Sequence, residues 1–291
     1  MIENAVKFVG EEDNVFNDDD YLLFYAIDPT YYNEENKSHI NPYRNSAYHD
    51  VQIGPENGLR MTAANPPVGN TDATFTTFHD YKFVETDDYN IGQMGRRWFG
   101  HLFYFENARS FSFEFPNLVT QSPLKLKIYA AAAAESNTSM EVNANGNLLN
   151  TLSFGAIDYG ILGTEAVFNG DFNSSSSSVT IDLNYNNNGN PSAKAYLDYI
   201  SIEAECELTS LGQQFQFKHN AMSTMSGIGE FIVSNASNIS EVWDVTNPYN
   251  PVFYQNANND SEFSFKTTLG SEKTFQTVDI SDAYTPTLLA A

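Results

Sequence analysis

The residues best suited to chemistry in this sequence are two adjacent arginines, Arg96 and Arg97, followed by Trp98. They stand out because the chain has 14 Lys and Arg residues against 37 Asp and Glu residues. Neighbouring side chains of a strand point to opposite faces. One arginine could therefore stack on an aromatic ring while the other binds a carboxylate through two hydrogen bonds. Such a group either contacts a ligand or partner, or forms an internal salt bridge that holds strands together.

An acidic turn at residues 11–20 is the second group of interest. Asp13, Asp18 and Asp20 carry the carboxylate oxygens that Ca²⁺ prefers as ligands. Their spacing differs from that of an EF-hand loop, which places its ligands at alternating positions around a central glycine. The turn is therefore either a calcium site or an acidic loop in contact with water.

A recognisable set of catalytic residues is missing from the sequence. The five histidines do not have a zinc-ligand spacing such as His-Glu-x-x-His, and the chain contains no phosphate-binding loop and no Gly-x-Ser-x-Gly elbow. The single cysteine, Cys206, lies among Glu203, Glu205 and Glu207, and nearby negative charge disfavours a reactive thiolate. We therefore predict that this chain has no catalytic residue and requires no cofactor.

The net charge of −23 restricts the classes of partner. A surface this acidic repels the phosphates of nucleic acids and the head groups of anionic lipids. No apolar run approaches the roughly 20 residues needed to span a membrane. We expect neither nucleic-acid binding nor direct insertion into a membrane.

The elements that would position these groups are predicted to be strands. Phenylalanines alternate with polar residues from 110 to 115, and residues 124–129 repeat this pattern, which is typical of a strand with one buried face. Residues 130–134 are all alanine, but we predict a strand there because they continue the alternating run. Asn145-Gly146 predicts a hairpin turn.

A change in pattern near residues 206–212 predicts a domain boundary. Residues 1–207 contain many short strands separated by turn signals, which is typical of an antiparallel β-sandwich or jelly roll. Residues 208–291 form a smaller β-rich region. The predicted fold class is all-β.

Five segments together resemble the PorU-like sortases of the type IX secretion system, which are gingipain-type cysteine peptidases. In chain order they are residues 16–25 (FNDDDYLLFY), 95–100 (GRRWFG), 113–118 (FEFPNL), 197–200 (LDYI) and 242–248 (VWDVTNP). Each segment is weakly specific alone, but their order matches that of the family over nearly the whole chain.

This resemblance implies an exported protein on the surface of a Gram-negative bacterium of the Bacteroidota. Members of the family remove the C-terminal sorting domain of secreted cargo with a His–Cys dyad. No position of this chain matches either dyad residue, and the sequence stops about where the peptidase domain should begin. We also interpret Met1 as a start introduced by cloning, because no signal peptide follows it.

We therefore expect a non-catalytic N-terminal β region that leads into a peptidase domain in the same chain. Its expected partners are that domain, the C-terminal domains of cargo and outer-membrane translocon proteins. A carbohydrate-binding module of a secreted or surface protein is the alternative, because aromatic side chains and an acidic calcium turn are common in such modules.

Overall fold

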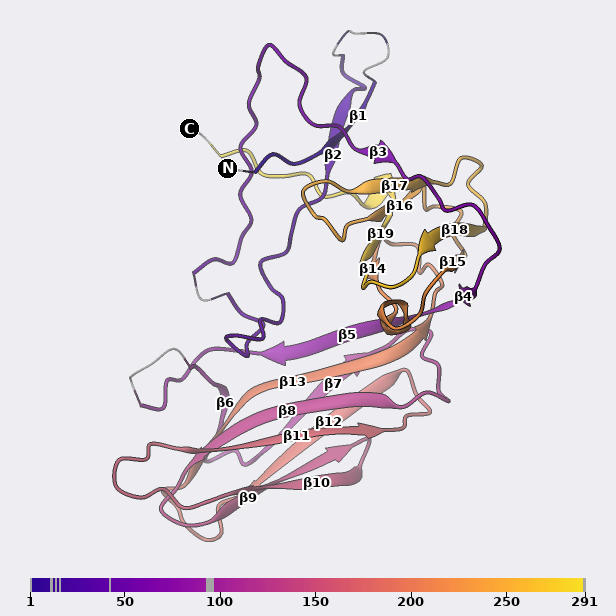
Figure 1. Ribbon diagram of the computed structural model, residues 1–291. Helices are drawn as coiled ribbons and strands as arrows, with labels where there is room; N and C mark the ends of the chain where they lie inside the picture. Colours follow the sequence, from indigo (N-terminus) through magenta and orange to yellow (C-terminus); the bar gives the residue numbers. More distant parts are fainter. Residues whose placement is uncertain are drawn as a thin grey trace. The chain divides into compact units, whose positions relative to one another are not determined.

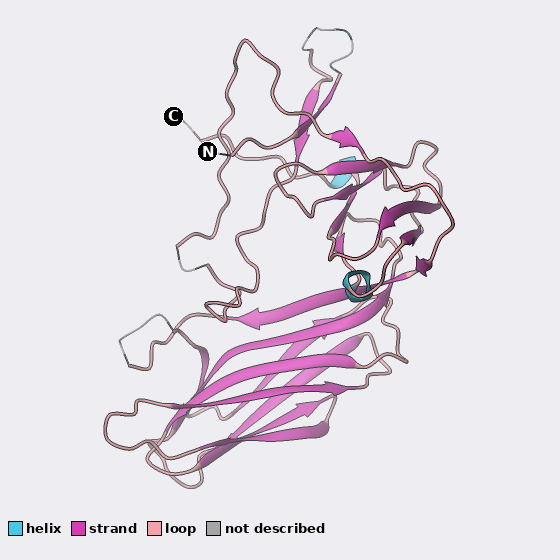
Figure 2. Ribbon diagram, viewed as in Figure 1, coloured by secondary structure: helices cyan, strands magenta, loops and turns pink. Residues whose placement is uncertain are grey.

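The computed structural model describes residues 2–10, 13, 15, 17–41, 43–92 and 97–289. Strands and loops make up nearly all of these residues, apart from two short 3-10 turns, η2 (Asn220–Ser223) and η3 (Ile280–Asp282) (Figures 1 and 2). This confirms the all-β fold class predicted from the sequence.

The chain divides into two compact units. Unit 1 consists of Met1–Asp28, Ser46–His79 and Glu207–Ala291, and unit 2 consists of Pro29–Asn45 and Asp80–Cys206. Neither unit is one continuous stretch of sequence.

Unit 2 is an antiparallel sandwich of two sheets (Figure 1). The four-stranded sheet has the order β10 (Asn147–Phe154), β9 (Thr138–Ala144), β12 (Ser178–Asn186) and β7 (Ala108–Glu114). The other sheet has the order β11 (Thr164–Phe172), β8 (Leu124–Ala133), β13 (Lys194–Glu207) and β5 (Thr77–Glu85), and β6 (Gly100–Phe103) also pairs with β13.

Alternation in the sequence builds the core of this sandwich. In β7, Phe111 and Phe113 are buried while Ser110 and Ser112 face water. The alanines of residues 130–133 continue β8, as predicted, and lie against neighbouring strands with almost no exposed surface except at Ala133. The β9–β10 hairpin turns at Asn145 and Gly146, whose φ angles of 49° and 78° are those of a type I′ turn.

Unit 1 is built from shorter strands in three sheets of its described residues. The two-stranded sheet is β1 (Val6–Val9) with β2 (Tyr21–Phe24). The five-stranded sheet has the order β14 (Gln216–Phe217), β19 (Phe275–Val278), β16 (Glu241–Asp244), β17 (Val252–Gln255) and β3 (Thr62–Ala63). The three-stranded sheet has the order β18 (Glu262–Thr268), β15 (Ile228–Ser234) and β4 (Ala73–Phe75).

Aromatic rings fill the space between the two larger sheets of unit 1. Phe231 of β15 lies 5.1 Å from the ring centre of Phe275 on β19 and 5.7 Å from that of Phe217 on β14. Phe265 of β18 packs 5.1 Å from Phe275 and 4.4 Å from Tyr254 of β17. Offset and edge-on ring pairs of this kind stabilise a core beyond their buried area.

The units differ from the predicted domains 1–207 and 208–291 in one respect. The chain passes from unit 2 to unit 1 at Glu207, close to the predicted boundary, but Met1–Asp28 and Ser46–His79 also belong to unit 1. The physical reason is parallel pairing, since β3 hydrogen-bonds with β17 and β4 with β15. Ala5 and Met61 also share a buried cluster with Trp243, Val245 and Val278.

Within the described ranges, no helix is both long and apolar enough to cross a membrane.

Candidate functional site

Arg97 forms an internal ion pair with Asp198. Its Nε lies 3.1 Å from Asp198 Oδ2, and its Nη2 also donates to that oxygen. The guanidinium lies 3.9 Å from the ring centre of Tyr129 and 5.5 Å from that of Phe99, so it stacks on one ring and approaches another. Carboxylate binding and ring stacking, which the sequence suggested for two arginines, are thus combined in one.

A β-bulge places the Asp198 carboxylate beneath Arg97. Leu197 pairs with Ala130 and Tyr199 pairs with Tyr129, so Asp198 is an additional residue of β13 with no partner on β8. A bulge redirects the side chain that it carries. Here it lets Asp198 reach the guanidinium.

Burial perturbs the acid–base behaviour of this pair. The Asp198 side chain is only 3% exposed, and burial raises its pKa to about 7, although Arg97 acts in the opposite direction. Glu85 and Asp87 raise that pKa further. Burial also raises the pKa of Tyr129 to about 12, assisted by its hydrogen bond to Glu165.

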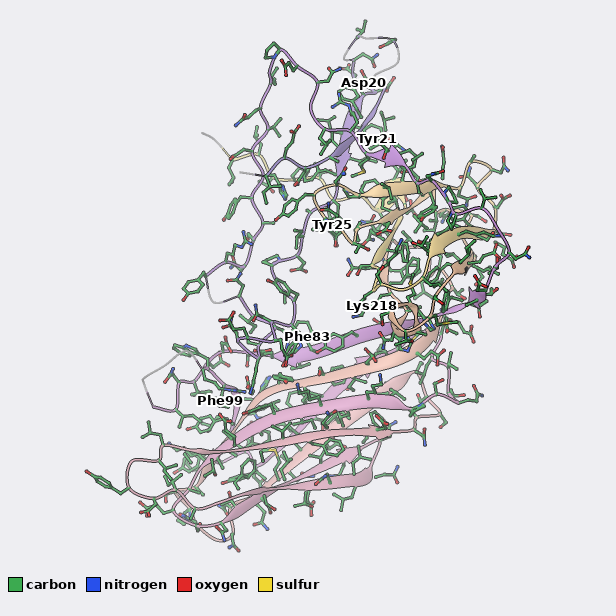
Figure 3. All side chains as sticks on the ribbon, in the orientation of Figure 1. Asp20, Tyr21, Tyr25, Phe83, Phe99 and Lys218 are labelled. Carbon is green, nitrogen blue, oxygen red and sulfur yellow. The ribbon has the colours of Figure 1, made fainter. Side chains whose placement is uncertain are left out.

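Trp98 is 43% exposed beside this buried pair. The next residue, Phe99 (labelled in Figure 3), is held by two backbone hydrogen bonds of 2.7 and 2.8 Å with Tyr89. Its ring packs with Ala131 and Tyr196. Arg97 and Phe99 therefore fix the strap of residues 97–99, and Trp98 is presented to water. Arg96 lies outside the described residues.

In the acidic turn, two of the predicted calcium ligands accept hydrogen bonds from nearby backbone N–H groups. Asp13 accepts from the backbone N–H of Val15, at 2.8 Å, and Asp20 accepts from that of Asn17, at 2.8 Å. Asp20, which directly precedes β2 and is labelled in Figure 3, also has its carboxylate against Gly10, the residue that follows β1. Asp18 is exposed. Across the described part of the chain, no group of three or more His, Cys, Asp or Glu residues is placed to hold a metal ion, and the calcium site stays a prediction.

A buried polar cluster that sequence reasoning missed lies on β5. His39 is fully buried, with Nδ1 2.6 Å from Glu85 Oε2 and Nε2 2.7 Å from the Tyr81 hydroxyl. Its ring stacks at 4.0 Å on that of Phe83, a residue of β5 that is labelled in Figure 3. Ser38 donates to the other oxygen of Glu85 at 2.6 Å. The cluster fastens residues 29–45 to the sheet, and no local pattern in a loop-rich segment indicates a partner 46 residues away.

Unit 1 has a cavity of about 410 Å³ beside Tyr25. Gln216 Nε2 donates to the Tyr25 hydroxyl at 2.7 Å, and burial raises the pKa of Tyr25. The cavity is lined by Tyr25, Ile27, Gln216, Val245, Thr246, Pro248, Glu272 and Thr274. Residues from the first and last of the five resembling segments therefore meet in this one cavity.

A second cavity, of about 380 Å³, lies on the outer face of the four-stranded sheet of unit 2. Its lining is mostly polar and consists of Ala108, Arg109, Ser110, Glu141, Asn143, Gly146, Asp182 and Asn184. Asp182 lies between Ser110 and Asn143 in the strand register and accepts a hydrogen bond from Ser110. No local pattern in the sequence indicates this site, because its residues come from three separate strands.

Comparison with known proteins finds an extensive structural likeness. A crystal structure of dimeric latent PorU from Porphyromonas gingivalis matches 99% of this chain with a TM-score of 0.77, at 18% sequence identity. This chain therefore shares the fold of the matched part of that protein. This chain spans 28% of that PorU chain. No protein-family model and no curated protein matches the sequence.

Smaller matches are to carbohydrate-binding modules. One, a module CBM36 in complex with calcium and xylotriose, is 15% identical and matches 42% of this chain and 98% of the module, with a TM-score of 0.28. Another, a family 35 module from Clostridium thermocellum, is 12% identical and matches 43% of this chain and 90% of the module, with a TM-score of 0.27. Scores this low carry no argument about ligand or function.

Proposed function

We propose that this chain is the non-catalytic N-terminal β region of a PorU-like sortase of the type IX secretion system. Its role is to dock cargo or translocon proteins for a cysteine peptidase domain that removes C-terminal sorting domains. The observation that carries this proposal is the match of the whole chain to part of PorU. An exported, surface-located protein follows from the same proposal.

The positions of the resembling segments support the proposal independently of the overall match. Arg97, from residues 95–100, pairs with Asp198, from residues 197–200. Tyr25, from residues 16–25, lines a cavity with Val245 and Thr246, from residues 242–248. Segments that are far apart in sequence are therefore in contact within each unit, as expected if they preserve one fold.

The burial of the single cysteine also supports a non-catalytic role for this chain. Cys206, its single cysteine, is fully buried one residue before the end of β13, where its backbone forms an isolated bridge with Leu118. A thiol in this position does not meet a substrate from solution.

The test is a pull-down with the purified chain as bait in a bacterium that has a type IX system, followed by proteomics and by binding measurements with purified cargo C-terminal domains. We expect recovery of these domains or of outer-membrane translocon components. Well-folded bait that retains neither would reduce the region to a support for its own peptidase domain and would overturn the docking role.

Carbohydrate binding is a second candidate, supported by the polar cavity on the four-stranded sheet. Carboxylates, amides and hydroxyls from three strands converge there, and such groups hydrogen-bond to the hydroxyls of a sugar. The described residues lining it include no aromatic ring, which weakens the case. A glycan array compared between the natural chain and Asp182→Ala decides it, since binding that is absent, or that survives the substitution, excludes this site.

A further inference from the structure

The loops at one end of the unit 2 sandwich form a single surface. Because their strands pair antiparallel, β8, β10 and β12 end where β7, β9, β11 and β13 begin. The loops that meet at this end are residues 86–92, 97–99, 104–107, 134–137, 155–163 and 187–193 (Figure 1). We call this surface the loop end.

Exposed apolar side chains are concentrated at the loop end. Trp98 is joined by Phe105, which is 91% exposed, and by Tyr159, which is fully exposed. Tyr89, Ile161 and Leu162 are exposed there as well. The loops at the opposite end, residues 115–123, 145–146 and 173–177, are all described and contribute no large exposed apolar side chain. Apolar side chains gathered on one surface typically mark an interaction site.

Contacts within the molecule order two of these side chains, Phe105 and Leu162. The ring of Phe105 packs 4.2 Å from that of Tyr104, and Lys194 covers Tyr104 at 5.1 Å. The side chain of Leu162 lies against Gly92. A surface ordered in this way loses little conformational freedom when a partner binds.

The loop end is also acidic. It carries Asp87, Asp88, Glu106, Glu135 and Asp158. Among the described residues, three cations lie near it: Arg97 pairs with Asp198, Arg109 pairs with Glu106, and Lys194 covers the ring of Tyr104. The described carboxylates of the loop end outnumber these cations.

We propose that the loop end binds a polypeptide segment in which apolar side chains lie next to lysine or arginine. Phe105, Ile161 and Leu162 have no hydrogen-bonding group in their side chains, which suits the apolar centre of a protein interface. The carboxylates attract basic side chains, and cations also bind to exposed aromatic faces. This inference rests on the proposed docking function and assigns its surface and the chemistry of its partner.

The experiment is to pan a phage library of random 12-residue peptides against the full chain, with counter-selection on Phe105→Ala/Tyr159→Ala. Both side chains are exposed, so this variant keeps its fold. We expect enriched peptides to combine aromatic or aliphatic residues with lysine or arginine. A synthetic peptide of the consensus sequence should bind the variant at least about 10-fold more weakly, a loss typical of interface hot spots.

Two further variants sharpen the result. Leu148→Ala removes an exposed apolar side chain of β10, next to the Asn145-Gly146 turn, and should leave peptide binding unchanged. Asp88→Asn/Asp158→Asn should weaken binding more at 50 mM than at 300 mM NaCl, because salt screens exposed charges. Binding can be followed by the fluorescence of Trp98. For this measurement the chain carries Trp243→Phe, so that Trp98 is its single tryptophan.

Several outcomes overturn the inference. In the panning, these are enrichment of acidic or purely polar peptides, or no enrichment at all. In the binding measurement, it is equal affinity of the consensus peptide for the natural chain and for Phe105→Ala/Tyr159→Ala. A dimer of the chain that this variant abolishes would also overturn it. If the pull-down captures cargo domains but panning selects no peptide, the docking function is supported and this surface is not its site. If panning selects the expected peptides but no cargo is captured, the surface binds peptides and the proposed docking function is wrong.

Discussion

Unit 2 and unit 1 stabilise their sandwiches by different means. Unit 2 relies on long strands, such as the 10-residue β8 and the 14-residue β13, and its interior combines many aliphatic side chains with buried rings such as Phe103 and Phe154. The strands of unit 1 are shorter, such as the four-residue β16, β17 and β19 and the seven-residue β15 and β18, and one cluster of aromatic rings fills the space between its sheets. Where strands are short, a few large side chains must supply most of the buried area. Unit 1 should therefore be the more sensitive to loss of a single side chain.

The units also bury carboxylates differently. In unit 2, Asp198 lies in a bulge under Arg97, and burial raises its pKa. In unit 1, Glu241 is 5% exposed, pairs with Lys7, and accepts a hydrogen bond of 2.7 Å from Trp243 Nε1. The pair in unit 1 joins segments 234 residues apart. It therefore ties the N-terminal strand to the C-terminal sheet.

The largest expected effect comes from Phe231→Ala, which leaves a cavity among the rings of Phe75, Phe217, Phe265 and Phe275. Removal of a buried phenylalanine lowers the free energy of unfolding by about 3–5 kcal/mol. Hydrogen exchange followed by mass spectrometry should show faster exchange in β15, β18 and β19 and little change in β8 and β12. Equal acceleration in both units would show that their stabilities are not separate. Phe231→Leu serves as the milder control.

Lys7→Met should destabilise unit 1 by roughly 1–3 kcal/mol, because it leaves a buried carboxylate without its cation. Burial lowers the pKa of Lys7, which indicates that the ammonium is itself partly desolvated. The matched control is Lys7→Met/Glu241→Gln, which removes the charge as well and should recover much of the loss. Urea unfolding monitored by Trp243 measures both. A double variant as unstable as the single one would assign the effect to lost packing against Phe253.

Asp198 should make the stability of unit 2 depend on pH. Its pKa is higher in the folded state, at about 7, than the usual value near 4, so the folded state binds the extra proton between these pH values. The contribution of Asp198 to the free energy of unfolding is therefore greatest below pH 4, and it is lost as the pH rises to about 7. We expect a loss of at most about 4 kcal/mol, since the two pKa values differ by about three units and one pKa unit corresponds to about 1.4 kcal/mol.

The control for this effect is Asp198→Asn, which cannot titrate. The difference in the free energy of unfolding between the natural chain and this variant should change between pH 4 and pH 8, with Arg97, Tyr129, Glu165, Glu85 and Asp87 present in both. A constant difference across this range would show that Asp198 stays ionised in the folded protein.

The smallest expected effect is that of Gly146→Ala in the β9–β10 turn. Gly146 has a φ of 78°, which costs a residue with a Cβ about 1–2 kcal/mol. Gly155→Ala is the matched control, because no atom lies closer than 4.0 Å to its added Cβ and its φ is not in the left-handed region. Thermal denaturation should show a lower Tm for the first variant and little change for the second. Equal Tm values would mean that the turn relaxes.

Much of unit 2 could be predicted because its signals are local. Alternation in residues 110–115 and 124–129 gives β7 and β8, and Asn145-Gly146 gives a hairpin, since each depends on neighbouring residues. The pairing of Arg97 with a carboxylate and a ring was also predictable by type, because cations are scarce. Its partner was not, since Asp198 lies 101 residues away and reaches Arg97 only through a bulge.

The sequence by itself determined the all-β class, the acidic surface and the order of most strands, because each follows from composition or from a period of two residues. Only the tertiary structure decided that β3 and β4 join unit 1, that His39 meets Glu85, and that the exposed rings gather at the loop end. Parallel pairing, buried polar contacts and clustered loops depend on which distant segments come together. That depends on the energy of the whole packed chain, which no local pattern records.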